Sequence, residues 1–376
     1  MSPARSTPAA GVALTQKPDI FERFHIDLPL LVLVLLLSAL GLLVLYSANG
    51  QQLGAVARQA IYCITAFLAM IGAAQISLLQ FQRWSPWAYM FGIGLLLLVA
   101  FVGVGEGSQR WLGVSGFRFQ PSEIMKLLVP VILAWYLAPQ SLPLKFRHLL
   151  VCLLLIGLPS ALVVLQPDLG TALLIVFSGL SVMFMAGLGW SYIVGGVVCL
   201  LCSAWPAWTY LLYDYQRQRI LTVFNPERDR LGQGWNIIQS KTAVGSGGWS
   251  GKGWNMGTQS QLDFLPESNT DFIAAVLAEE FGFRGILLVL LLYVLILLRG
   301  CWISWRAQDG FSRLVAAGLT MTFTMNVFIN MGMASGMLPV VGIPLPLISA
   351  GGTSLVTMMA GFGILMSISV GKKVTG

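Results

Sequence analysis

Long runs of apolar residues are the feature of this sequence that most limits how the chain can fold. A helix rises about 1.5 Å per residue, so roughly 20 apolar residues span the hydrocarbon core of a bilayer. The candidate spans are Leu28 to Tyr46, Ala57 to Gln75, Trp87 to Val104, Ile124 to Leu137, Leu149 to Leu165, Leu169 to Leu188, Tyr192 to Leu212, Ile273 to Leu298, Leu314 to Met333 and Ser349 to Val370. These runs do not alternate with period two, which favours helices over barrel strands. The sequence predicts an all-α integral membrane protein with ten transmembrane helices.

Positive charges between the spans indicate the orientation, because Lys and Arg concentrate in short cytoplasmic loops. With the N-terminus inside, the cytoplasmic side holds Arg5, Lys17, Arg23, Arg83, Lys145, Arg147, Arg299, Arg306, Arg313, Lys372 and Lys373. The short outer loops hold Arg58, Arg110 and Arg118. Both termini are therefore expected in the cytoplasm, with a large extracytoplasmic loop between helices seven and eight.

The expected organisation is a cytoplasmic tail over residues 1–27, partly disordered, and a single polytopic membrane domain over residues 28–376. Within that domain, residues 213–270 form the large periplasmic loop. The tail has no short apolar run with a cleavage site, so no removable signal peptide is expected. The net charge is +7. Anionic lipid at the cytoplasmic face explains that charge, and no nucleic-acid partner is expected.

One polar cluster on the outer side combines Arg110 and Arg118 with the segment Ser122-Glu123 and with Lys126. Ser122 and Glu123 are typical of a helix start. Glu123 and Lys126 are three residues apart and can form an ion pair on that helix. However, a lysine one turn into an apolar span is costly unless it is paired or near water. Cations grouped at a membrane edge also suit an anionic headgroup such as a diphosphate. The structural and the functional explanation both stand.

The large outer loop is a second polar region, rich in Gly, Gln, Ser and Trp. Its candidate substrate-binding residues are Gln239, Ser240 and Lys241, and further along Gln259 and Ser260. Amides, hydroxyls and indole rings provide the hydrogen-bonding groups and flat apolar faces that a carbohydrate needs. The competing interpretation is an interfacial loop whose aromatic residues belong to the membrane belt.

Carboxylates mark two further places. Asp168 lies in a tight outer turn, where capping the next helix is the favoured interpretation. Asp271 is expected in the first turn of the eighth span, where the helix dipole alone explains it. Alternatively, it is a base at the outer mouth of a membrane cavity. Glu279 and Glu280 are expected near the bilayer interior. Glu280 could then pair with Arg284, and Glu279 with the lysine of the first cluster or with another helix.

The sequence offers few residue types that could carry out catalysis on the outer side. The two histidines, His25 and His148, fall on the cytoplasmic side, and the sequence has no P-loop, GxSxG, HExxH or zinc spacing. The sequence therefore indicates no dedicated metal site and no certain cofactor. Proton chemistry on the outer side must use a carboxylate or a lysine.

Ordered strings of residues carry a resemblance to a known family. They are Gln109-Arg-Trp-Leu, Arg118-Phe-Gln-Pro-Ser-Glu with Lys126, Gln166-Pro-Asp-Leu-Gly-Thr, Tyr215-Gln-Arg-Gln-Arg, Gln239-Ser-Lys, Gly-Ser-Gly-Gly248, Gly-Lys-Gly-Trp254, Gly-Thr-Gln-Ser-Gln261, Phe-Leu-Pro-Glu267, Thr-Asp-Phe272 and Gly342-Ile-Pro-Leu-Pro-Leu. Together they resemble the SEDS family (shape, elongation, division and sporulation proteins), and within it the branch that acts in cell elongation. One string departs from the family pattern, because Ser349-Ala-Gly-Gly replaces the usual Ser-Tyr-Gly-Gly.

The resemblance implies a multi-pass protein of the bacterial inner membrane with its active site facing the periplasm. It implies a peptidoglycan glycosyltransferase that polymerises lipid II together with a class B penicillin-binding protein. The essential aspartate of the family falls on Asp271. The family's Pro-Ser-Glu and following lysine fall on Glu123 and Lys126, and its Arg-Trp falls on Arg110 and Trp111.

The resulting hypothesis is that Asp271 takes a proton from a sugar hydroxyl as it attacks a lipid-linked donor. Arg110, Lys126 and Lys241 would balance charge on the leaving diphosphate. A divalent cation such as Mg²⁺ or Mn²⁺ could share that task. Ser122, Asp168 and Glu279 would support the site. The alternative hypothesis is a lipid II flippase, in which the same polar rim is a gate for the substrate.

Overall fold

The structure is a computed structural model that describes residues 25–104, 110–114, 117–140, 144–229, 232–262 and 264–371. Most of the predicted tail lies outside the described residues, as do Gln109, Lys372 and Lys373. The side chain of Arg118, predicted to belong to the first polar cluster, also lies outside them.

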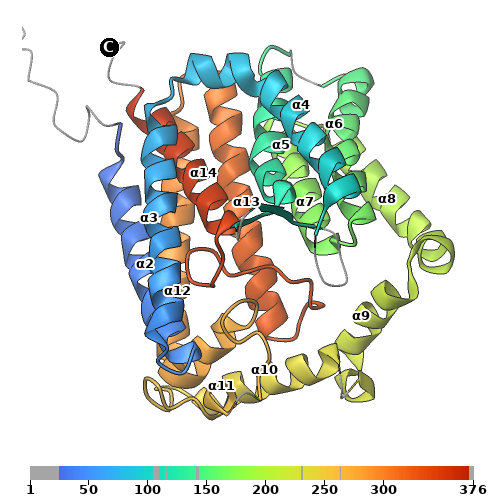
Figure 1. The fold of residues 1–376 in the computed structure, drawn as a ribbon. Coiled ribbons are helices and arrows are strands. Elements are labelled where there is room, and N and C mark those ends of the chain that lie inside the picture. Colours follow the sequence, from blue (N-terminus) through green and yellow to red (C-terminus); the bar gives the residue numbers. More distant parts are fainter. Residues whose placement is uncertain are drawn as a thin grey trace, which may run out of the picture.

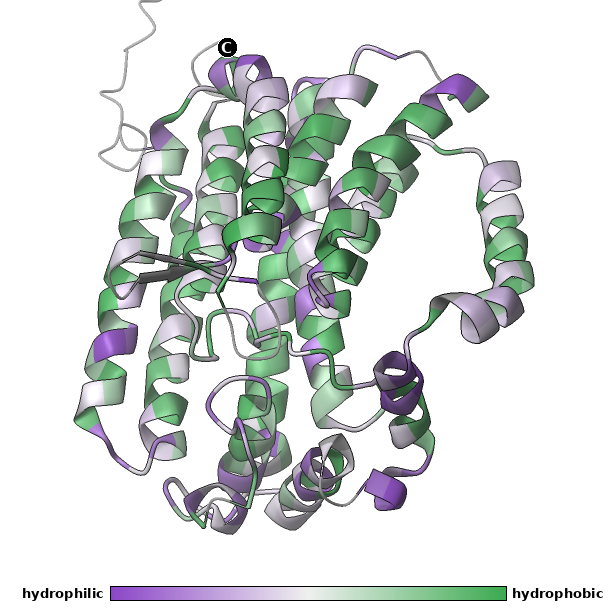
Figure 2. Cartoon of the chain, turned by 45° about the vertical axis from the view of Figure 1, so that its right-hand side comes forward, coloured by the Kyte–Doolittle hydropathy of each residue, from purple (hydrophilic) through white to green (hydrophobic). Residues whose placement is uncertain are grey.

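Each of the predicted spans falls on a helix. These helices are α2 (Leu28–Ala48), α3 (Leu53–Gln75), α4 (Leu78–Val102), α5 (Pro121–Leu137), α6 (Phe146–Leu165), α7 (Leu169–Met185), α8 (Trp190–Pro206), α12 (Ile273–Arg306), α13 (Gly310–Ala334) and α14 (Thr353–Val370). Among the described residues, eight helical segments are long and apolar enough to cross a membrane. α5 and α7 are shorter, at 17 residues each. The helices stand side by side as a bundle and are largely apolar along their length (Figures 1 and 2).

The described parts of both chain ends meet at one end of the bundle. The carboxylate of Asp27, which caps α2, lies 2.6 Å from Nη2 of Arg299 near the end of α12. The same carboxylate accepts a hydrogen bond from Ser369 at the end of α14 (2.5 Å). Figure 1 shows α10 (Gln233–Gly247) and α11 (Thr258–Gln261) covering the opposite end. The bundle therefore has two distinct ends.

The segment predicted as the large outer loop contains helices that the sequence analysis did not anticipate. Besides α10 and α11, it contains α9 (Asp214–Phe224) and a 3₁₀ turn over Pro226–Asp229. A π-helical turn over Ala207–Leu211 precedes it at the end of α8. α8 stands away from the bundle in Figure 1, and no residue of this fully described helix is buried.

The all-α prediction missed a short hairpin between α4 and α5. β1 (Leu112–Val114) pairs antiparallel with β2 (Phe117–Phe119), and Gly113 lies opposite Arg118. A bridge between Val104 and Trp111 extends the ladder. Because α4 ends at Val102 and α5 begins at Pro121, the hairpin fills the connection between two helices.

A break at Gly282 divides α12 into two helical parts. Gly282 adopts φ 66° and ψ −162°, a region open almost only to glycine. A Cβ there would lie 2.3 Å from the amide nitrogen of Gly251. The break therefore brings the outer segment into direct backbone contact with the helix.

The Gly248–Gly253 segment satisfies the backbone groups that the break leaves open. The amides of Phe283 and Arg284 donate to the first two carbonyls of this segment, at 2.9 and 3.2 Å. The carbonyls of Glu279 and Glu280 accept from its last two amides, at 2.9 and 3.0 Å. Unpaired backbone groups inside a membrane protein are costly, so the segment stabilises the broken helix.

We expect Gly282→Ala to destabilise the protein strongly. The backbone conformation alone costs about 1–3 kcal/mol for a residue with a side chain, and the new Cβ overlaps the backbone of Gly251. Thermal unfolding in detergent should show a clearly lower midpoint. Gly94→Ala is the matched control, because Gly94 lies in α4 with open space around it. Equal midpoints for the two variants would contradict the role assigned to the break.

Candidate active site

Asp271 lies in the turn that leads into α12 and not, as predicted, in the first helical turn. The helix begins at Ile273 and its N-cap is Phe272. The amides of Thr270 and Phe272 donate to the carbonyl of Glu267, at 3.1 and 3.3 Å, and this tightens the turn. Asp271 is 9% exposed. Capping therefore does not account for this carboxylate.

The surroundings of Asp271 make its carboxyl a stronger base than an ordinary aspartate. Burial raises its pKa, and the nearby charge and hydrogen bond of Glu267 raise it further, to about 7. Glu267 itself is exposed and has a positive φ of 54°, uncommon for a residue with a side chain. A carboxyl with a pKa near 7 suits proton transfer at neutral pH. Glu267 belongs to the Phe-Leu-Pro-Glu string of the family resemblance, but its sequence position alone does not reveal this effect on Asp271.

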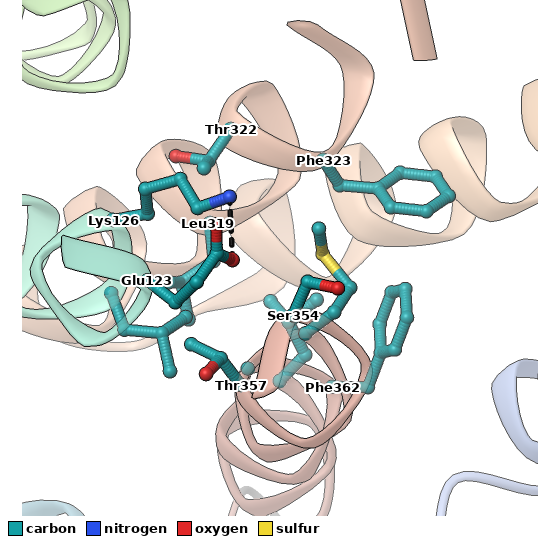
Figure 3. Close-up of a pocket in the computed structure, with 12 residues that line it drawn as sticks. Glu123, Lys126, Leu319, Thr322, Phe323, Ser354, Thr357 and Phe362 are labelled. Atoms are coloured by element: carbon teal, nitrogen blue, oxygen red, sulfur yellow. Dashed lines mark ion pairs between the residues drawn. The ribbon is translucent and has the colours of Figure 1, made fainter. Parts of the chain in front are cut away.

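Glu123 and Lys126 form the predicted ion pair, with Nζ to Oε2 at 2.7 Å. α5 begins at Pro121, which places Ser122 and Glu123 in its first turn, although Gln120 is the N-cap. Both charged side chains point toward α13 and α14 (Figure 3). They line a cavity of about 20 Å³ with neighbours that include Thr322, Ser354 and Thr357. Such a volume holds about one water, so the pair is buried in the bundle.

Arg110 contacts the turn between α6 and α7. Its Nε donates to the carbonyl of Gln166 (3.2 Å), and its Nη2 donates to that of Pro167. Its Nη1 lies 3.9 Å from Oδ1 of Asp168. Asp168 caps α7 as predicted, accepting from the amide of Thr171 at 3.2 Å. Arg110 thus joins the hairpin to this turn, and its guanidinium is partly occupied by protein groups.

The predicted ion pairs of Glu279 with Lys126 and of Glu280 with Arg284 are wrong, whereas the alternative that Glu279 contacts another helix is confirmed at α11. Glu279 does not pair with Lys126, because Lys252 lies 2.6 Å from its Oε1. Thr258 also donates to that oxygen, at 3.0 Å. Glu280 accepts from Ser47 instead of pairing with Arg284. The break at Gly282 removes the helical spacing that such a pair needs, and the Arg284 guanidinium lies 5.8 Å from the ring of Trp249.

The candidate residues of the outer loop divide between structural and free groups. Ser240 is buried and donates to the carbonyl of Ala334 at the end of α13 (2.6 Å). Ser260 is buried and donates within its own turn, and the amide of Gln259 donates to Glu279 at 3.1 Å. Gln239 is half-buried, and Lys241 is exposed with its stem lying over Gly336. Lys241 is thus more accessible to a ligand than Arg110, which is only partly exposed.

An apolar cavity of about 410 Å³ lies between α10, α12 and α13. Ala274 and Ala278, in the first turns of α12, line it together with Val244 of α10 and Phe328 of α13. The cavity therefore begins next to the turn that holds Asp271. Its lining suits an alkyl or isoprenoid chain better than a sugar.

Within the described residues, no group of three or more His, Cys, Asp or Glu side chains gathers as a metal site. The described cysteines are all free thiols. The suggested divalent cation stays a prediction.

Comparison with known proteins identifies the family. Residues 27–374 match the FtsW/RodA/SpoVE family, described as cell cycle proteins. The chain is 46% identical to the peptidoglycan glycosyltransferase MrdB of Escherichia coli K12, over 95% of this chain and 97% of that protein. It is 36% identical to the stage V sporulation protein E of Bacillus subtilis, over 91% of this chain and 96% of that one.

A solved structure has a fold similar to that of this chain. A chain from a study of how a peptidoglycan synthase complex coordinates polymerisation and crosslinking has a TM-score of 0.82. It is 30% identical and covers 93% of this chain and 98% of its own length. With its apolar helices and these relatives, the chain is a multi-pass protein of the bacterial inner membrane. It belongs to the FtsW/RodA/SpoVE family of cell cycle proteins, the family also called SEDS.

Proposed function

We propose that this protein is a peptidoglycan glycosyltransferase that polymerises lipid II into glycan strands, with Asp271 as the general base. The observation that carries the proposal is the buried carboxyl of Asp271, with a pKa raised to about 7. The glycosyltransferase name of the relative at 46% identity supports the reaction class. The rod-shape protein RodA of Thermus thermophilus, with a TM-score of 0.70 at 26% identity, supports a role in elongation.

The topology that fits this function has ten spans and both termini in the cytoplasm. Asp27, Arg299 and Ser369 meet at one end of the bundle. Asp271 precedes α12, whereas Arg299 lies near its other end. If the end holding Arg299 faces the cytoplasm, as the loop charges favour, then Asp271 faces the periplasm. Lipid-linked precursors would reach it from the outer leaflet.

The proposed reaction joins two lipid-linked disaccharides. The 4-hydroxyl oxygen of the acceptor sugar attacks the anomeric carbon of the donor, and the hydroxyl proton passes to the carboxylate of Asp271. The bond from that carbon to the diphosphate oxygen breaks, and the lipid diphosphate leaves with the electron pair. Attack opposite the leaving group converts an α-linked diphosphate into a β-1,4 glycosidic bond.

The candidate cations would stabilise the charge that grows on the leaving diphosphate. Lys241 of α10 is exposed, with its side chain beside Gly336 just after α13, and the Arg110 side chain is 25% exposed. Lys126, paired with Glu123, would act from deeper in the bundle. Gln239 and Gln259, which are half-buried, would contact sugar or peptide groups, whereas the buried Ser260 would support their turn. A divalent cation on the diphosphate remains part of the proposal.

The proposed partner is a class B penicillin-binding protein that crosslinks the new strands. The similar chain in a peptidoglycan synthase complex supports this pairing. Purified protein with lipid II in detergent tests the function, because no membrane separates substrate from site. Glycan strands, with or without the partner, support the enzyme. Unchanged lipid II under both conditions would contradict it and favour the flippase.

The rate of polymerisation should rise with pH through about 7. Below the raised pKa of Asp271 the carboxyl is protonated and cannot accept a proton, so the rate should fall about tenfold per pH unit. In Glu267→Gln the neighbouring negative charge is lost, so the pKa of Asp271 falls. The acid limb of the pH–rate profile, over which the rate rises with pH, therefore moves to lower pH. The measurement is initial rate against pH. The matched control is Asp214→Asn, at an exposed aspartate on α9, which should leave the limb in place. A limb that stays put in Glu267→Gln would refute the coupling.

A further inference from the structure

The turn that holds Asp271 is bound at three successive carbonyl groups by residues from distant parts of the chain. The carbonyl of Asn269 accepts from the amide of Ala350 (2.9 Å). The carbonyl of Thr270 accepts from Oγ of Ser349 (2.6 Å). The carbonyl of Asp271 accepts from Nδ2 of Asn330 (2.9 Å). A turn held at each residue has little freedom to rotate.

Asn330 and Ser349 also bind the loop between α13 and α14. The side-chain amide of Asn330 also donates to the carbonyl of Ile343 (2.7 Å), so this one side chain joins the loop to the Asp271 turn. The Ser349 hydroxyl accepts from the amide of Leu345 (2.7 Å) while it donates to Thr270. Asn330 is completely buried and Ser349 is 4% exposed. Each side chain therefore uses two bonds to join two separate segments.

The loop itself is anchored to the bundle. The hydroxyl of Tyr293 in α12 donates to the carbonyl of Pro346 (2.6 Å). Gln59 of α3 donates to the carbonyl of Ser349 (3.4 Å) and accepts from the amide of Gly351 (3.3 Å). Leu347 has a positive φ of 65°, a conformation that persists only when its surroundings hold it. The loop is thus a fixed support and not a free connection.

The same loop forms the wall against which the carboxylate rests. Gly342 has φ 76°, and a Cβ there would lie 3.5 Å from Oδ2 of Asp271. The glycine therefore leaves a bare backbone face beside the carboxylate. Of the described residues, the charged group that acts on Asp271 is Glu267 from its own turn. The facing α13 and loop contribute Asn330 and Gly342, which carry no charge.

We infer that Asn330 and Ser349 are positioning residues that clamp the Asp271 turn to the Gly342–Gly351 loop and so aim the Asp271 carboxylate. This inference rests on the proposed function, because it assigns the two residues to a base at position 271. Neither residue touches the reacting atoms. Their effect passes through the backbone of the turn.

The test compares Asn330→Ala, Ser349→Ala and the double variant with a matched control. Ser367→Ala is that control, because Ser367 is also buried and its hydroxyl donates to a carbonyl of another element, Ile76 (2.9 Å), at the opposite end of the bundle. Polymerisation of lipid II is measured in detergent at equal amounts of folded protein, as kcat, KM and rate against pH. Asp271→Asn is included as a reference.

We expect kcat to fall about 10- to 100-fold in both clamp variants, since small displacements of a reacting group cost this much, while KM changes little. A looser turn admits water to Asp271, so the acid limb should move to lower pH. The kcat of the double variant should fall by less than the product of the two single-variant fold decreases, because both side chains hold the same turn. Ser367→Ala should keep kcat and the limb.

Clamp variants that keep the wild-type limb and lose no more kcat than Ser367→Ala would overturn the inference. The milder Ser349→Ala keeps the test decisive if Asn330→Ala does not fold. Failure of the proposed function looks different, because Asp271→Asn would then stay active. An inactive Asp271→Asn beside unaltered clamp variants rejects the clamp alone.

Discussion

Asp271→Asn should lose about 10²- to 10⁴-fold in polymerisation rate, the usual contribution of a general base. Asparagine has the same shape but cannot accept the hydroxyl proton at neutral pH. The carboxyl is buried beside Glu267, so the neutral amide removes an unfavourable charge from the site. We therefore expect the variant to fold at least as well as the wild type.

Glycan strands resolved on a gel give the rate for this variant, and thermal unfolding in detergent gives its stability. Asp214→Asn, at an exposed aspartate on α9, is the control for loss of a carboxylate as such and should stay active. An inactive Asp271→Asn with a much lower unfolding midpoint would assign the residue to the fold instead of the reaction.

Glu123→Ala should destabilise the protein by about 3–5 kcal/mol, because it leaves the buried ammonium of Lys126 without its partner. The two atoms are 2.7 Å apart, and both side chains are at most 6% exposed. Thermal unfolding should show a large decrease in the midpoint, or no folded protein should be recovered.

The double variant Glu123→Leu with Lys126→Met separates stability from function. Replacing a buried ion pair with apolar residues of similar size is often neutral or stabilising. We expect the double variant to regain stability but not polymerisation, since Lys126 is proposed to act on the diphosphate. A stable and fully active double variant would show that the pair is structural.

The bundle could be predicted because apolar length is set by the thickness of a membrane. Each expected span overlaps a helix, including α5, whose Lys126 interrupts the apolar pattern, although Ser349, expected in the last span, lies in the loop before α14. The Glu123–Lys126 pair could also be predicted, because three-residue spacing brings two side chains together on one helix. The Asp168 cap followed from its position before an apolar run.

The break in α12 was not predictable in the same way. Gly282 lies between Glu280 and Arg284 in a stretch that reads as one continuous helix, and nothing in its neighbours marks a positive φ. The error then affected Glu280, whose pairing with Arg284 was predicted on an unbroken helix. Lys252 binds Glu279 across 27 residues of sequence, a distance over which spacing rules carry no information.

The clamp that Asn330 and Ser349 form around the Asp271 turn could not be predicted from the sequence, for a similar reason. Asn330 and Ser349 reach the turn from 59 and 79 residues away. A signal for one of them was present, because an amide inside an apolar span must find a partner. Asn330 lies among Met, Ile and Phe residues of α13. The hairpin and α9 gave weaker signals, because short segments with few apolar residues show little periodicity.

The most direct test of the account is the rate of glycosidic bond formation by wild type and Asp271→Asn at equal folded concentration, with saturating lipid II in detergent. We expect efficient polymerisation by the wild type and at least a ~100-fold slower rate for the variant. Rates within a few-fold of each other would contradict the assignment of Asp271 as the base.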